Sequence, residues 1–394
     1  MGLNASNKIK FSDALELMKY ELLAQEKGVV KQVPTLAGKP GIGKTESLKA
    51  LGKKLGYETI VVQLSAVSPE EFSGIPEFED APEDFAKKYS ITGVDKAKFT
   101  RWSIPELVAI VNHRAEEIKK KGDGKIKGIV VLFDDIHVAD PALERYMFNL
   151  FLDKVVGQYR LADNVLVCAA MNDSDEAGFN GFNAAVLDRL AIYPVEFDFN
   201  YWYSIIGGKL DNIIAAFLRS HKERAQGDES VDKVTPSPRS WTELSNFIKF
   251  MRKNNVEINE EILRNAACAR VGSETAAELI KFKITYDNFN FEKLIKEPVE
   301  NIKVPDDIIE QILYADLVRY IKDINDAKKI AKLIERYEEK QTFVTGIINE
   351  ASILNNFKEY KNNKGLEYLI DWFIKSDRVN LNKAFFDSIG EIID

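Results

Sequence analysis

The sequence reads Gly38-Lys39-Pro40-Gly41-Ile42-Gly43-Lys44-Thr45 at the point that decides its fold, and this stretch fits the phosphate-binding pattern G-x-x-x-x-G-K-S/T. The apolar residues 33–37 before it predict a buried strand, and residues 46–51 after it predict the start of a helix. A glycine-rich loop between strand and helix lets backbone N–H groups and the positive helix end face one anion. An ordinary Gly-Pro turn is the alternative. The predicted nucleotide-binding residues are Gly38, Lys39, Pro40, Gly41, Ile42, Gly43, Lys44, Thr45 and Glu46, with Lys44 reaching the β- and γ-phosphates.

A second apolar run supplies the acids that such a loop needs. Residues 128–133 are apolar and are followed by Asp134 and Asp135, which predicts a strand buried on both faces of a parallel sheet. Ligands bind at the carboxyl ends of such strands. We therefore expect Thr45 and Asp134 to ligate Mg²⁺, and Asp135 to polarise the attacking water. The alternative is that the two acids only cap the helix that follows.

Further apolar runs complete the predicted sheet. The run at residues 165–171 ends at Asn172, whose amide can orient water near the γ-phosphate, although Asn after a strand is also a common turn residue. Two more strands are expected at residues 58–64 and 192–197. The predicted fold class is α/β, a parallel sheet of the P-loop NTPase type flanked by helices and followed by helical regions.

The hydrophobic patterns divide the chain into four predicted parts. These are an N-terminal helix at 1–28, a nucleotide-binding α/β domain at 29–199, a helical lid at 200–289 and a helical C-terminal region at 290–394. Within the α/β domain, residues 65–103 are expected to be an insert, mostly irregular, and residues 154–163 a hairpin.

The composition is that of an ordinary soluble protein. The chain has 394 residues, of which 45% are hydrophobic and 29% charged, and its net charge of −8 argues against a surface that coats nucleic acid. No apolar run approaches the ~20 residues of a membrane span. Cys168 and Cys268 are the only cysteines, which suits a reducing cytoplasm. The histidines His113, His137 and His221 have no metal-binding spacing.

In their order along the chain, these motifs resemble an AAA+ ATPase of the MoxR and dynein-related branch. Residues 136–141 are similar to the continuation of that branch's D-E-I-N-R-A, and residues 169–173 to its A-T-Q-N-P. Residues 186–190 are similar to L-D-R-F, and residues 237–240 to S-P-R-A. The resemblance covers residues 30 to about 285 and implies an AAA+ core followed by a lid.

The resemblance also implies roles for three polar side chains. Asn172 would be sensor 1, Arg189 the arginine finger that meets the γ-phosphate held by a neighbouring subunit, and Arg239 sensor 2 in the lid. From the residues alone, each arginine could instead pair with a local acid, such as Asp188 or Glu243.

One departure bears on turnover. The family usually has Glu where this chain has Asp135, and Asp is shorter by one methylene. The attacking water would then be held less well, so we expect slow hydrolysis. Leu190 in place of Phe is expected to affect only packing.

The resemblance implies a Mg²⁺-dependent ATPase that forms a hexameric ring and acts as a chaperone or remodeller of a protein client. Such relatives often act with a von Willebrand factor A-domain protein. Two alternatives stay open: a nucleic-acid motor or restriction-type NTPase, and a slow-turnover module in which nucleotide mainly supports assembly.

Overall fold

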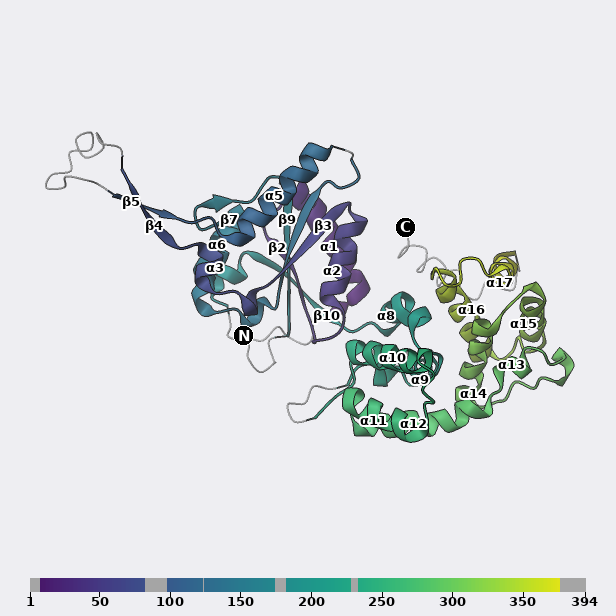
Figure 1. The fold of residues 1–394 in the computed structure, drawn as a ribbon. Coiled ribbons are helices and arrows are strands. Elements are labelled where there is room, and N and C mark those ends of the chain that lie inside the picture. Colours follow the sequence, from purple (N-terminus) through teal and green to yellow (C-terminus); the bar gives the residue numbers. More distant parts are fainter. Residues whose placement is uncertain (1–7, 82–97, 123, 174–181, 228–232, 376–394) are drawn as a thin grey trace. The chain divides into compact units, whose positions relative to one another are not determined.

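The computed structural model describes residues 8–81, 98–122, 124–173, 182–227 and 233–375. The chain divides into two compact units, Met1–Asp198 and Phe199–Asp394 (Figure 1). None of the described helices combines the length and the apolar character needed to span a bilayer.

The first unit is built on a parallel sheet of six strands. In spatial order they are β1 (Ile9–Lys10), β10 (Leu190–Glu196), β2 (Val33–Ala37), β9 (Val165–Met171), β6 (Gly128–Asp134) and β3 (Tyr57–Gln63). Every neighbouring pair runs parallel. Strands β2, β6 and β9 are buried along their whole length, which explains their continuous apolar sequences.

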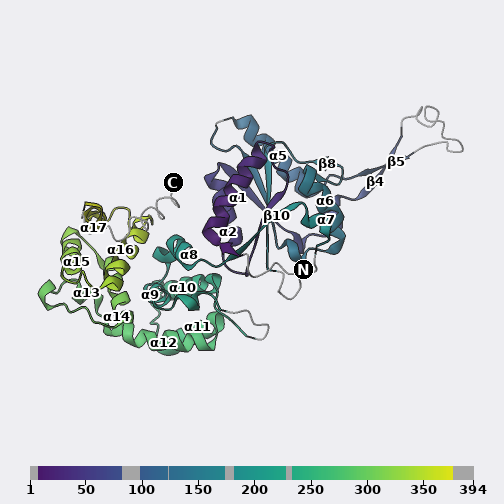
Figure 2. The same cartoon turned by 180° about the vertical axis from the view of Figure 1, so that it is seen from behind.

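Helices cover both faces of this sheet (Figures 1 and 2). They are α1 (Phe11–Glu26), α2 (Lys44–Lys54), α5 (Glu106–Lys121), α6 (Glu144–Asp153) and the short α7 (Ala184–Leu187). Helices α5 and α6 share one core with Val131 and Phe133 of β6. Helix α2 packs on the opposite face, where Gly52 approaches Val130. The strand alternation therefore divides the core into two layers.

The segment between β3 and α5 is more regular than expected. It contains a 3₁₀ turn (Leu64–Ala66), α3 (Pro69–Ser73), β4 (Pro76–Asp80) and β5 (Lys98–Trp102). The two strands pair antiparallel and lead away from the main sheet (Figure 1). An ion pair of 2.6 Å joins Arg101 and Glu79 across them. The expectation of an irregular segment here was wrong, because exposed strands lack the apolar run by which a buried strand is recognised.

A small hairpin lies in the range predicted for one, formed by β7 (Val155–Val156) and β8 (Tyr159–Arg160). The Tyr159 hydroxyl donates a 2.6 Å hydrogen bond to the carbonyl of Trp102 at the base of the β4–β5 ribbon. Two segments that lie on either side of β6 in the sequence therefore contact each other directly.

The second unit is helical. Its α-helices are α8 (Phe199–Ile206), α9 (Asn212–Ser220), α10 (Pro238–Lys253), α11 (Glu260–Val271), α12 (Ser273–Asn288), α13 (Phe291–Leu294), α14 (Ile308–Leu313), α15 (Ile324–Arg336), α16 (Gln341–Asn355) and α17 (Lys364–Lys375), with the 3₁₀ segment η8 at Tyr314–Tyr320. Ser237 caps α10 and Pro238 is its first residue.

Four charged side chains are buried together in this helical unit. Arg219 of α9 forms an ion pair of 2.8 Å with Glu350 of α16 and a second pair with Asp316 of η8. Arg319 of η8 donates a 2.6 Å hydrogen bond to Glu350. Burial raises the pKa of Asp316. Burial also acts to raise the pKa of Glu350, but the two arginines outweigh it and hold that pKa below its usual value. The charges balance, which is the condition for burying them.

Candidate active site

The loop after β2 has the backbone that a phosphate cradle needs. Gly41 and Gly43 have positive φ angles of 75° and 98°, and Gly43 directly precedes α2. A Cβ atom at Gly38 would come within 2.7 Å of Val195. Only glycine fits these positions without strain, so the pattern of glycines reflects the shape of the loop.

Lys44 is held on the inner side of this loop. Its side chain is buried, and Nζ donates hydrogen bonds to the carbonyls of Gly38 at 2.7 Å and Lys39 at 2.9 Å. The third partner is Asn172 Oδ1, at 2.9 Å. The structure therefore brings together Lys44 and the amide of Asn172, which directly follows β9. An ammonium group at this place suits the oxygens of a nucleotide phosphate.

Thr45 and Asp134 also meet, since Thr45 Oγ1 donates a 2.6 Å hydrogen bond to Asp134 Oδ2. The other carboxylate oxygen accepts the backbone N–H of Asp135 at 3.0 Å. Hydroxyl and carboxylate oxygens are ligands that Mg²⁺ accepts. No three His, Cys, Asp or Glu side chains gather into a metal site within the described ranges. The pair thus fits a Mg²⁺ ion that takes its remaining ligands from phosphates and water.

Asp135 directly follows β6 and has an unusual backbone conformation. Its φ angle is 53°, in the left-handed region that Asp tolerates better than most residues. The next turn, Ile136–Val138, begins directly after it. The alternative that the two acids cap the following helix is wrong, because Asp140 caps that segment by accepting the N–H of Ala142 at 2.7 Å.

His137 belongs to the site, although the spacing of the three histidines predicted no role for it. It is 4% exposed, and its Nδ1 accepts the backbone N–H of Asn172 at 3.3 Å. Burial lowers the pKa of His137, and the charge of Asp135 opposes this shift. His137 follows Asp134 by three residues, but its partner is a backbone N–H, so the sequence carries no clear signal for this contact.

Arg189 lies apart from these groups within the same chain. Its carbonyl accepts the N–H of Val33, the first residue of β2, whereas the loop follows the last residue of β2. At about 3.3 Å per residue, the length of β2 places roughly 16 Å between them. The guanidinium donates to the carbonyl of Ala185 at 2.6 Å and stacks on Phe148, with 4.9 Å to the ring centroid. An arginine so placed cannot contact the phosphates bound by its own loop.

Arg239 lies in the second unit, exposed in the first turn of α10. Its contact with a nucleotide stays a prediction. Neither arginine pairs with the local acid named as the alternative: among the described residues, Arg189 forms no ion pair with Asp188, and Arg239 none with Glu243.

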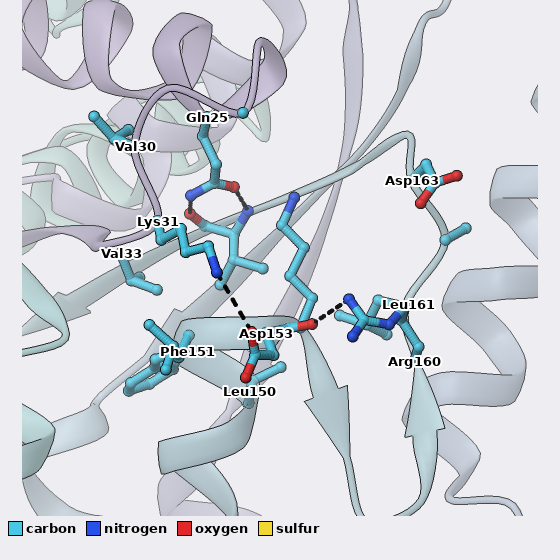
Figure 3. A pocket seen from close by; sticks show the side chains of 15 residues that line it. Gln25, Val30, Lys31, Val33, Leu150, Phe151, Asp153, Arg160, Leu161 and Asp163 are labelled. Atoms are coloured by element: carbon cyan, nitrogen blue, oxygen red, sulfur yellow. Dashed lines mark hydrogen bonds and ion pairs between the residues drawn. The ribbon is translucent and has the colours of Figure 1, made fainter.

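A cavity of about 240 Å³ lies elsewhere in the first unit, near the amino ends of the strands (Figure 3). The amide of Gln25 closes one side by binding both backbone groups of Val167, at 2.7 and 3.2 Å. Lys31 and Asp153 form an ion pair of 3.6 Å at its edge. None of the predicted site residues lines this cavity, so we place the chemistry at the phosphate loop and not here.

A comparison with known protein families identifies the part of the chain that contains the phosphate loop. Residues 34–192 match the family model described as ATPase family associated with various cellular activities (AAA). Together with the sheet, this match shows an AAA+ fold and confirms the predicted fold class. No curated protein sequence matches the chain.

Two solved structures show how distant the structural neighbours are. The Thermotoga maritima RuvB Holliday junction branch migration motor is 16% identical, with a TM-score of 0.35 over 66% of this chain and 69% of that one. C. elegans PCH-2 is 16% identical, with a TM-score of 0.30 over 71% of each chain. Similarity at this level carries no argument about activity.

Proposed function

Because residues 34–192 match the AAA ATPase family model, we propose that this chain is a Mg²⁺-dependent ATPase that converts ATP to ADP and phosphate. The proposal is supported by two side-chain contacts at the carboxyl edge of the sheet. Thr45 contacts Asp134 at 2.6 Å, and Lys44 contacts Asn172 at 2.9 Å. A cation, a hydroxyl, a carboxylate and an amide are the groups that phosphoryl transfer requires.

In this proposal each side chain has a defined task. The loop amides and Lys44 bind the phosphate oxygens, and Lys44 exchanges its bonds to loop carbonyls for bonds to phosphate. Bound Mg²⁺ would be held by Thr45 and Asp134 and would neutralise phosphate charge. Asp135 would orient the attacking water and accept its proton, and the amide of Asn172 would help to orient that water.

We further propose that the active site is completed by a second copy of the chain. Arg189 cannot reach its own loop, because the length of β2 separates them. Its guanidinium would stabilise the charge that develops on the phosphoryl group bound by the neighbouring protomer. A closed ring, for which the family resemblance implies six subunits, would supply one such arginine to every site. Arg239, in the lid, would then convert the loss of the γ-phosphate into a domain rotation.

The biological role that fits best is an ATP-driven remodeller of a protein partner, as in MoxR-like proteins, with a von Willebrand factor A-domain protein as one type of partner. The net charge of −8 supports a protein over a nucleic acid. A slow-turnover assembly module is the second candidate, because Asp135 is both shorter than the usual Glu and held at φ 53°.

Steady-state ATP hydrolysis by the wild type and by Lys44→Ala tests the enzyme proposal. We expect Mg²⁺-dependent turnover that Lys44→Ala abolishes, and equal rates would refute it. Size-exclusion chromatography with and without ATP tests the ring. Affinity capture with Asp135→Asn, which should bind ATP without hydrolysing it, tests for a protein client. Stimulation by DNA that weakens with salt would instead favour a nucleic-acid motor.

A further inference from the structure

The imidazole of His137 connects the two strand ends that carry the predicted catalytic groups. It stands three residues after Asp134, and its Nδ1 accepts the N–H of Asn172 at 3.3 Å. The regular pairing of β6 with β9 runs only as far as Phe133 and Ala169. The imidazole therefore supplies a hydrogen bond at the level where backbone pairing between the strands has ended.

This hydrogen bond is protected and has a defined direction. The His137 side chain is 4% exposed, so water competes little for the bond. Burial lowers the pKa of His137, and Lys44 contributes in the same direction, although Asp135 and Asp134 oppose it. A ring whose Nδ1 accepts a hydrogen bond is in the neutral form, which has one acceptor nitrogen. Because Nδ1 accepts, the proton is on Nε2.

Asn172 is held by one hydrogen bond at its backbone and another at its side chain. Its backbone N–H is bound by His137, and its side-chain Oδ1 accepts from Lys44 Nζ at 2.9 Å. If the backbone bond is lost, the peptide of Asn172 can rotate, and the amide moves away from the Lys44 ammonium. A small displacement of such a group has a large effect on rate, because the reacting geometry is fixed by contacts of this kind.

We propose that His137 is a positioning residue for ATP hydrolysis, which acts by fixing the backbone of Asn172 and with it the amide that faces Lys44. This inference rests on the proposed ATPase function. His137 acts through Asn172 and is not itself a catalytic residue. It therefore affects the rate of hydrolysis more than the affinity for ATP.

Two substitutions at His137 separate this role from simple packing. In His137→Asn, the side-chain oxygen is attached to Cγ, as Nδ1 is, and can still accept the N–H of Asn172. In His137→Gln, the amide lies one bond further out, at the level of Nε2, and that N–H loses its acceptor. The control is His113→Gln, since the His113 side chain is 78% exposed on α5.

Hydrolysis and hydrogen exchange provide two independent readouts. We expect His137→Gln to lower kcat by about 10- to 100-fold, the size found when a residue that orients a functional ligand is removed. KM for ATP should change little. His137→Asn and His113→Gln should behave as the wild type. Exchange of the Asn172 amide with deuterium should be fast in the Gln variant and slow in the other three proteins.

Wild-type turnover by His137→Gln, or turnover by a folded His137→Asn as slow as that of the Gln variant, would overturn the proposal. Thermal melting of each variant separates loss of folding from loss of rate. If His137→Gln does not fold, exchange in His137→Asn decides: slow exchange of the Asn172 amide supports the proposal, and fast exchange with wild-type turnover overturns it. If the wild type is no faster than Lys44→Ala, the proposed function fails and the role in hydrolysis fails with it. Exchange at Asn172 still shows whether the hydrogen bond forms.

Discussion

The buried charges of the helical unit lead to a quantitative prediction for Glu350→Gln. Glu350 is fully buried and binds Arg219 at 2.8 Å and Arg319 at 2.6 Å. The substitution keeps the size of the side chain and removes its charge. Two arginines then share only Asp316, so one positive charge is buried without a counter-charge. Breaking a buried pair in this way costs about 3–5 kcal/mol of unfolding free energy.

The size of the effect can be measured by thermal or urea unfolding of the full chain. For a unit of this size, each kcal/mol lowers the melting temperature by about 2–4 °C, so a decrease of about 6–20 °C is expected for the transition of the helical unit. The matched control is Glu260→Gln in the exposed pair with Arg264, which should cost less than about 0.5 kcal/mol.

A double variant tests the reasoning itself. Arg319→Met combined with Glu350→Met removes one charge of each sign and leaves Arg219 paired with Asp316. Because the remaining charges balance, this variant should be more stable than Glu350→Gln. If Glu350→Gln costs no more than the exposed control, the four charges are not coupled as described, and the argument is refuted.

Three further predictions concern the active site. Gly43→Ala should weaken nucleotide binding at least tenfold, because φ at this residue is 98° and alanine is strained there. Titration with a fluorescent ATP analogue measures the affinity, and an unchanged affinity would show that the loop tolerates a side chain. Asp135→Glu should raise kcat if the shorter acid limits the rate, and equal or lower turnover in a steady-state assay would remove that explanation. Arg189→Ala and Lys44→Ala should each abolish hydrolysis, but a mixture should regain part of it, since some sites combine an intact Lys44 with a neighbour's intact Arg189. A mixture that stays inactive although mixed oligomers form would argue against an arginine acting between protomers.

The central strands and the phosphate loop were predictable because a local physical requirement restricts which residues each of them can contain. A strand buried on both faces, such as β6 or β9, is apolar throughout, and the phosphate loop needs glycine at fixed positions. The meeting of Thr45 with Asp134 then follows from topology, since parallel strands end at the same edge.

Other features depend on contacts between distant segments, which leave no local pattern. The β4–β5 ribbon was missed because β4 is exposed along its whole length. The ion pair between Arg219 and Glu350 joins residues far apart in the sequence, and the residues that flank each of them form no motif that predicts it. His137 was missed for a related reason: its partner is a backbone N–H, and any residue type can provide one.

The hydrogen bond from Tyr159 to the carbonyl of Trp102 has a mechanical consequence. The ribbon precedes β6 in the sequence and the hairpin follows it, yet this hydrogen bond joins the hairpin to the base of the ribbon. A force applied to the ribbon is therefore passed on to the hairpin, whose two ends lead directly into α6 and β9. A partner that binds the ribbon and pulls on it therefore also pulls on the hairpin.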